Sequence, residues 1–138
     1  MTSRLSVSHL LPPDEALRRL ATVRFGRLVY SRRALLAVHP VDHLVDDGVI
    51  VVHTDPATLT LTGHRQVVAY EADSIDNDTR VGWHVTVEGV VEEVGEPDRL
   101  RWYQEVWHPA AVAGRLLRIH PEIVTGAEYR GPATIMTG

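Results

Sequence analysis

The sequence contains no cysteine, and its 14 basic residues are all arginine, so lysine is absent as well. Without cysteine the chain forms neither disulfides nor thiolate metal sites, and any anion site must use arginine, histidine or backbone N–H groups. No apolar run approaches the roughly 20 residues needed to cross a bilayer. The N-terminal stretch carries Arg4 and Pro12-Pro13 and lacks the apolar core of a signal peptide. We therefore expect a cytoplasmic protein without a membrane partner.

The composition is that of an ordinary globular protein, with 44% hydrophobic and 23% charged residues. A length of 138 residues fits one domain with a sizeable core, and we expect a single domain over residues 1–138. The formal net charge of −4 argues against a nucleic-acid partner held through phosphate contacts.

The stretch 81–91 carries the clearest pattern in the sequence. From His84 onward polar residues alternate with β-branched apolar ones, which is typical of a strand with one face in the core. Gly82 and Gly89 indicate a turn, a bulge or a close approach of another backbone segment. Trp83 and His84 could line a pocket for a planar ligand. Alternatively, Trp83 caps the core and His84 hydrogen-bonds locally. This stretch alone favours the second interpretation.

The same reasoning predicts further strands at 26–30, 34–45, 49–54, 66–73 and 116–129, the last interrupted at His120-Pro121. Helices are expected at 8–24, 58–64 and from 95 onward, the last burying Leu100, Tyr103, Val106 and Trp107. Residues 1–25 thus form an N-terminal helical segment, and the tail 131–138 is expected to fray. Pro40 indicates an edge strand or a bulge, and Asp46-Asp47-Gly48 a hairpin turn. The sum predicts a mainly β fold, a six-stranded antiparallel barrel with short flanking helices.

The eight histidines (9, 39, 43, 53, 64, 84, 108 and 120) contain no HExxH motif and no i, i+4 pair on a convincing helix. We therefore expect no metal site. The chain also has no GxSxG motif, which, with the lack of cysteine, leaves nucleophilic catalysis without support.

The segment His53-Thr54-Asp55-Pro56-Ala57-Thr58 joins a buried strand directly to an expected helix start. Free N–H groups in the first turn of a helix can bind a phosphate, and the hydroxyls of Thr54 and Thr58 could assist. An ordinary helix capped by Asp55 explains the same residues. Both interpretations stay open at this point.

Several segments together resemble a known family in their order and spacing over most of the chain. They are VRFGRLV (23–29), PVDH (40–43), DGVIVVHT (47–54), VVAYEAD (67–73), GWHVTVEG (82–89) and LRIHPEIVTG (117–126). The resemblance is to the pyridoxamine 5′-phosphate oxidase-like FMN-binding split-barrel family, in particular its small actinobacterial-type members. It implies a six-stranded split barrel, a homodimer, and FMN in a groove between the two subunits; some relatives bind the deazaflavin F420 instead.

The resemblance also implies a set of cofactor-binding residues. By position they are Pro40, Val41, Asp42, His43, His53, Thr54, Thr58, Trp83, His84 and Val85, with Arg118 as a possible replacement cation. The phosphate segment departs from the family pattern, which usually has Arg at 53 and Gly-Ser-Lys or Gly-Thr-Lys at 56–58. Asp42 likewise replaces a usual Asn, and His84 a usual Ser.

Two functional hypotheses follow. The first is an FMN- or F420-dependent oxidoreductase that transfers a hydride to or from a small organic substrate at the dimer groove. The second is a split-barrel module without flavin. It would bind another ligand, for example haem, or catalyse a cofactor-free reaction with groove histidines 43, 53 and 84, His84 being the catalytic acid–base.

Overall fold

The structure, a computed structural model, describes residues 5–55, 65–107 and 114–131. Its elements are β1 (Ser6–Leu10), α1 (Pro13–Leu20), β2 (Phe25–Arg32), β3 (Leu35–Asp46), β4 (Val49–Thr54), β5 (Val67–Ile75), β6 (Gly82–Glu93), α2 (Pro97–Trp107) and β7 (Arg115–Arg130). The helix that we expected at 58–64 lies outside the described residues. The expected tail, 131–138, lies outside them as well, apart from its first residue. Within the described residues, no helix is both long and apolar enough to span a membrane.

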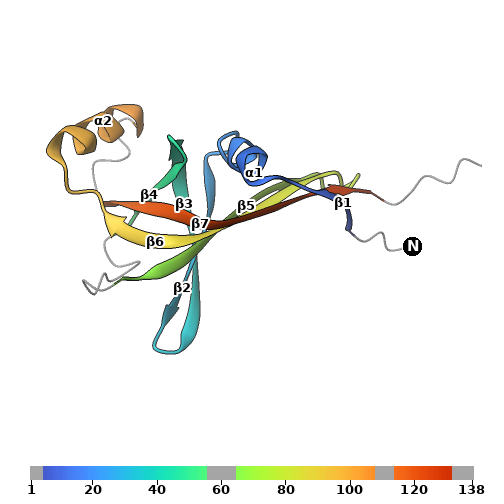
Figure 1. Ribbon diagram of the computed structural model, residues 1–138, viewed down its shortest axis with the longest axis horizontal. Helices are drawn as coiled ribbons and strands as arrows, with labels where there is room; N and C mark the ends of the chain where they lie inside the picture. The colour runs from blue at the N-terminus through green and yellow to red at the C-terminus, as the bar shows by residue number, and fades with distance from the viewer. Residues whose placement is uncertain (1–4, 56–64, 108–113, 132–138) are drawn as a thin grey trace, which may run out of the picture.

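Strands β2 to β7 pair antiparallel into a closed ring in the order β2-β3-β4-β7-β6-β5, with β5 returning to β2. The predicted mainly β, six-stranded antiparallel barrel is therefore confirmed (Figure 1). The 16-residue β7 makes this closure possible. One of its edges pairs with β6, while the other pairs first with β4 and then, after β4 ends, with β1.

Side chains at alternate positions of each strand point inward and fill the barrel interior. On β6, Val85 and Val87 are fully buried and Trp83 nearly so, whereas His84 and Thr86 face outward. Helix α1 contributes Ala16 and Leu20 to the same core, so it covers part of the interior. The alternation predicted for this strand is confirmed.

Both glycines of β6 allow another backbone segment to come close. A Cβ on Gly82 would lie 1.9 Å from the carbonyl oxygen of Ser74, and a Cβ on Gly89 would lie 1.9 Å from that of His120. Opposite Gly89, β7 contains a β-bulge, because Glu88 pairs with Ile123 while Gly89 pairs with Pro121. The interruption expected at His120-Pro121 is thus a bulge within one continuous strand.

The expected N-terminal helix was wrong in its first part. Residues Ser6–Leu10 form β1, and α1 begins only at Pro13. The residue that precedes a proline is pushed toward extended geometry, so Pro12-Pro13 separates the strand from the helix. The predicted edge position of Pro40 is confirmed, because β3 pairs there with β2 alone and its pairing with β4 starts at Asp42.

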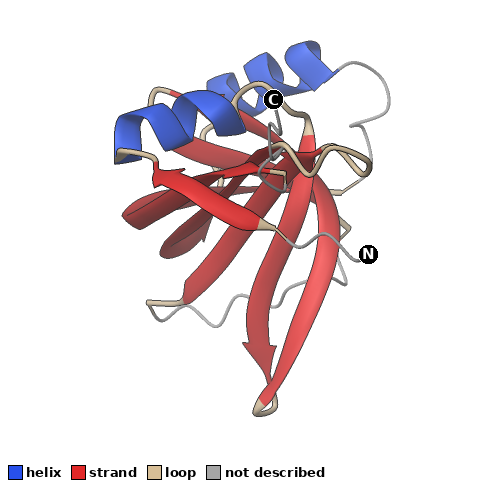
Figure 2. Ribbon diagram, turned by 90° about the vertical axis from the view of Figure 1, so that its right-hand side faces the viewer, coloured by secondary structure: helices blue, strands red, loops and turns tan. Residues whose placement is uncertain are grey.

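Helix α2 packs on the outer side of the barrel rather than inside it. Tyr103 is buried and forms a second small core with Val51 and Leu116, and its hydroxyl donates to Asp46 Oδ2 at 2.6 Å. The predicted buried stripe is only partly right, since Val106 remains 42% exposed. Figure 2 shows both helices gathered on one side of the strands.

Candidate functional site

Strand β3 divides its predicted site residues between two sides. Pro40 and Asp42 point to the outside of the barrel and are exposed, whereas Val41 and His43 are buried. Because successive side chains of a strand alternate, neighbouring residues of the predicted segment enter different environments.

A cavity of about 560 Å³ lies over β3, between the segment that joins α1 to β2 and the C-terminal end of α2. We call it the β3 cavity; it is lined by Ala21, Val23, Arg24, Asp42, His43, Leu44, Val45, Val106 and Trp107. Its volume falls within the range typical of small-molecule pockets, and its lining is mostly apolar with few charged groups.

The end of β4 lies beside this cavity. His53 pairs with Asp42 across the two strands, and its ring centroid is 6.1 Å from that of Trp107. Gly114 lies against the same histidine, since a Cβ at this position would come within 2.7 Å of His53 Nε2. Asp42, His43 and His53, predicted from separate segments, therefore meet around one end of β3 and β4.

Thr54 is buried, and its hydroxyl has no hydrogen-bond partner among the described residues. A buried polar group without a partner costs about 1–3 kcal/mol. By alternation along β4, this hydroxyl lies on the inner side of the strand with Ile50 and Val52, and it is closed to solvent. Thr58, the other predicted threonine, lies outside the described residues.

His43 lines the cavity, but both of its ring nitrogens are hydrogen-bonded within the fold. Its Nε2–H donates to the carbonyl oxygen of Leu20 at 2.9 Å, which leaves Nδ1 to accept the hydroxyl proton of Tyr70 at 2.5 Å. Burial lowers the pKa of His43, so the ring is neutral near pH 7. Burial also raises the pKa of Tyr70, which stays protonated as the donor.

His84 lies on the outer side of β6 in a polar network that we call the β6 face, made by Arg27, Glu71, His84 and Thr86. His84 Nε2 is 2.9 Å from Glu71 Oε2 and 3.3 Å from Thr86 Oγ1. Arg27 Nη1 binds the other oxygen of the same carboxylate at 2.5 Å. Glu71 thus fixes the orientation of the imidazole.

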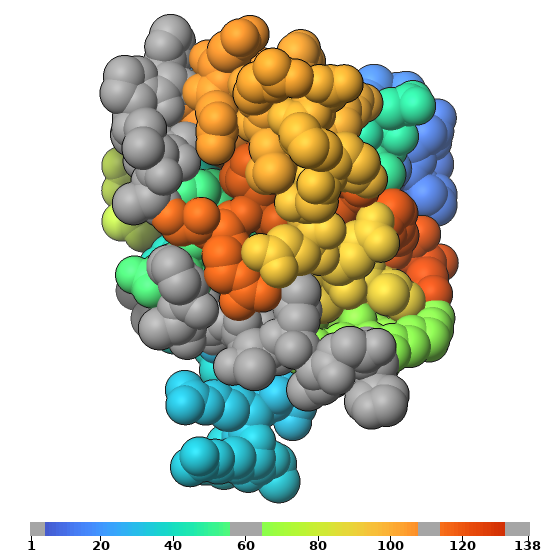
Figure 3. All heavy atoms as spheres, turned by 90° about the vertical axis from the view of Figure 1, so that its left-hand side faces the viewer, coloured from blue at the N-terminus to red at the C-terminus, as the bar shows by residue number. Residues whose placement is uncertain are grey.

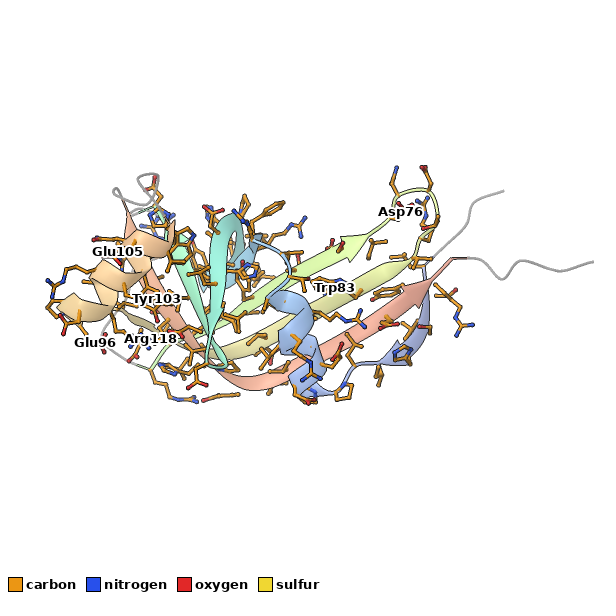
Figure 4. The ribbon with its side chains drawn as sticks, turned by 90° about the horizontal axis from the view of Figure 1, so that it is seen from above. Asp76, Trp83, Glu96, Tyr103, Glu105 and Arg118 are labelled. Carbon is orange, nitrogen blue, oxygen red and sulfur yellow. The ribbon has the colours of Figure 1, made fainter. Side chains whose placement is uncertain are left out.

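Strands β3 and β6 lie opposite each other in the ring, so their outward side chains point in opposite directions. Within one chain His43, His53 and His84 do not converge, because His43 points inward and the other two occupy different outer faces. Trp83 and Val85, predicted to touch a ligand, are buried in the core. Figure 4 shows Trp83 far along the barrel from Tyr103 and the α2 end.

Arg118 lies under α2 and is already neutralised. Its guanidinium contacts Glu96 at 3.1 Å and Glu92 at 3.3 Å, and its side chain is only 14% exposed. Figure 4 shows Arg118 beside Glu96 at the α2 end. Arg118 is therefore not a free cation that could replace the missing ones.

Sequence reasoning missed Arg24 and Trp107 at the β3 cavity, and Arg27 and Glu71 at the β6 face. Trp107 was assigned only to a buried helical stripe, and Arg24 only to the last residue of the expected helix 8–24. Alternation along 67–73 could have placed Glu71 outward, but its pairing with His84 needs the register between β5 and β6. In the part of the chain that the structure describes, no three His, Asp or Glu side chains are grouped as metal ligands.

The closed ring, with β1 added where β4 leaves β7, defines a split β-barrel. A family model described as pyridoxamine 5′-phosphate oxidase matches residues 12–128, and the chain belongs to this family. Among curated proteins, the chain is 42% identical over 124 residues to the uncharacterized protein Rv0080 of Mycobacterium tuberculosis. That match covers 84% of this chain and 82% of the relative.

Solved structures share the architecture. A Corynebacterium glutamicum protein provisionally named a pyridoxamine 5′-phosphate oxidase is 28% identical, with a TM-score of 0.72 over 88% of this chain and 93% of its own. An FAD-binding protein of Mycobacterium smegmatis is 24% identical, with a TM-score of 0.67 over 88% and 97%. One from Mesorhizobium loti is 20% identical, with a TM-score of 0.68 over 91% and 98%. The last two likenesses show a common fold.

Proposed function

We propose that this protein binds a flavin, FMN or the deazaflavin F420, at the β3 cavity and is an oxidoreductase that transfers a hydride to or from a small organic substrate. The observation that carries this proposal is the cavity of about 560 Å³ that brings Asp42, His43 and Trp107 together beside His53. Membership of the pyridoxamine 5′-phosphate oxidase family supports it independently.

The apolar part of the cavity lining suits the ring of a flavin. Trp107 offers an aromatic surface and Val23, Leu44 and Val106 an apolar one, which match a flat heterocycle. No Arg or Lys occurs between residues 54 and 64, so the segment after β4 brings no fixed positive charge.

The proposed site is completed by a second copy of the chain. The outer side of the barrel exposes large apolar side chains on four strands: Phe25 of β2 (66%), Val38 of β3 (54%), Val67 of β5 (51%) and Ile123 of β7 (55%). Apolar side chains exposed on one surface are typical of interaction sites. The β2–β3 hairpin also projects beyond the body of the molecule, as Figure 3 shows, and Leu36 near its tip is 78% exposed.

A homodimer through this surface would set the β6 face of one subunit against the β3 cavity of the other. This arrangement would unite residues that one barrel keeps on opposite sides. When bound, the flavin supplies the hydride chemistry. The chain supplies a histidine, His84, held by Glu71 through Nε2 with Nδ1 left to exchange a proton with a ligand.

The decisive experiment is an absorption spectrum of freshly purified protein, followed by release and mass measurement of any bound molecule. A flavin or deazaflavin band is expected, together with a rise in melting temperature when FMN or F420 is added. A colourless protein whose melting temperature does not change with either compound would contradict the proposal.

The absence of Arg and Lys between residues 54 and 64 favours one alternative, a split barrel that binds a ligand other than flavin. Haem is the example to test first, because a Soret band would report it in the same spectrum. A cofactor-free reaction using three clustered histidines is not carried forward, since His43 is buried and hydrogen-bonded on both ring nitrogens.

A further inference from the structure

The β3 cavity carries two charged side chains of opposite sign, Arg24 and Asp42. All 18 Asp and Glu residues of the chain lie within the described ranges. Within those ranges the structure records no ion pair and no side-chain hydrogen bond for Arg24; its backbone carbonyl accepts the N–H of His43 at 2.8 Å. The guanidinium is therefore a cation at the cavity that no carboxylate of the chain neutralises.

Other arginines near either half of the proposed site are already occupied. Arg118 is bound by Glu92 and Glu96, and Arg27 is bound by Glu71. Arg115, close to the end of β4, contacts Glu93 at 3.4 Å. Among the described residues that line the cavity, Arg24 is the one arginine.

We propose that Arg24 binds the phosphate group of the flavin in this protein, in place of the cations that the segment after β4 does not contain. This inference rests on the proposed function. Arginine suits the role because its planar guanidinium can donate two parallel hydrogen bonds to phosphate oxygens. Loss of one charge-assisted contact corresponds to a weakening of about 10–100-fold in affinity.

Asp42 should affect FMN binding in the opposite direction from Arg24. Its carboxylate lines the same cavity and repels a phosphate, so its neutralisation should strengthen FMN binding. We expect Asp42→Asn to tighten FMN about 3–10-fold, because the group is exposed and its charge is partly screened. Riboflavin, which has the same ring but no phosphate, should respond to neither substitution.

The test is a fluorescence titration of the apoprotein with FMN and with riboflavin. The variants are Arg24→Ala and Asp42→Asn, and Arg130→Ala is the matched control, an exposed arginine at the end of β7 that does not line the cavity. If only the deazaflavin binds, F420 and its phosphate-free chromophore form the equivalent pair.

The expected result is that Arg24→Ala weakens FMN binding selectively, with unchanged riboflavin binding and with Arg130→Ala equal to the parent. Equal FMN affinity in Arg24→Ala and the parent overturns the role of Arg24 while leaving the flavin proposal intact. An equal loss for FMN and riboflavin also overturns it, because the side chain would then act through packing. Failure of the parent to bind any of the four compounds overturns both proposals together.

Discussion

The β3 cavity and the β6 face occupy opposite sides of one barrel and differ in how their polar groups are satisfied. At the cavity, Arg24 has no carboxylate partner within the described residues, and the lining is mostly apolar. At the β6 face, Arg27, Glu71 and His84 form a connected network with contacts of 2.5 and 2.9 Å. In the proposed function the ligand occupies the cavity, and the β6 face presents the fixed side chain of His84 to a second copy of the chain.

The same contrast occurs over a single residue step on β3. Asp42 faces the outside and is exposed, while His43 faces inward and is 2% exposed. A charge near a ligand can change without harm to the fold, but a buried hydrogen-bonded ring cannot. We therefore expect substitution of His43 to reduce the stability of the fold far more than substitution of Asp42.

The largest effect is expected from His43→Leu. This substitution leaves the hydroxyl of Tyr70 and the carbonyl of Leu20 without their present partner, which should cost about 2–4 kcal/mol of stability. Urea unfolding measures it, with Asp42→Asn as the control that should stay within about 0.5 kcal/mol. Similar losses at both positions would remove the distinction between the inner and outer sides of β3.

The next effect concerns the proposed dimer. Val38→Glu places a carboxylate in the exposed apolar surface of β3 and should raise the dimer dissociation constant about 10–100-fold. Sedimentation equilibrium measures this constant. Val7→Glu on β1 is a control of similar exposure, 56% against 54%, and should leave association unchanged. A parent protein that is monomeric at all concentrations would argue against a shared site.

A smaller effect is expected from pH, because the ring of His43 stays in place. Burial lowers the pKa of His43 in the folded state, so the unfolded chain takes up its proton first. The stabilisation that His43 provides is therefore present above about pH 6.5 and is lost as pH falls below that value. Urea midpoints measured between about pH 7.5 and about pH 5.5 should decrease.

A separate loss belongs to more acidic conditions. The hydrogen bond from His120 lowers the pKa of Glu92, and two hydrogen bonds from backbone N–H groups lower that of Asp76. These carboxylates stabilise the fold above their unfolded pKa values, near pH 4, and lose that contribution below them. For His43 itself, urea midpoints that do not change down to about pH 5 would contradict the prediction. They would show that its ring is as accessible to protons in the folded chain as in the unfolded one.

The smallest effect is expected from Glu71→Gln at the β6 face. The carboxylate is partly exposed, so its ion pairs should contribute only about 0.2–1 kcal/mol. The sharper measurement is the ring ¹⁵N spectrum of His84, which should show the proton on Nε2 in the parent and a mixture of tautomers in the variant. Glu88→Gln, the next outward acidic position of β6, is the control. An unchanged tautomer in Glu71→Gln would mean that Glu71 does not orient His84.

The sequence by itself determined the six barrel strands and the hairpin at Asp46-Asp47-Gly48, but not β1. At Gly82 and Gly89 it indicated a turn, a bulge or a close approach, and the structure shows the close approach. These features depend on alternation and on local backbone freedom, and both are visible in a single chain. The resemblance to the family added the closed split barrel, since the pairing of strands distant in sequence cannot be derived from their local patterns.

Only the tertiary structure decided which side chains share a surface. A one-residue difference in phase turns a strand residue from the outside to the core, which is why His43 became structural and Asp42 stayed at the cavity. The register between strands set Glu71 beside His84, and the packing of α2 brought Trp107 to the cavity and enclosed Arg118. Such neighbours are fixed by the closure of the ring, because contacts between distant segments exist only once the barrel has formed.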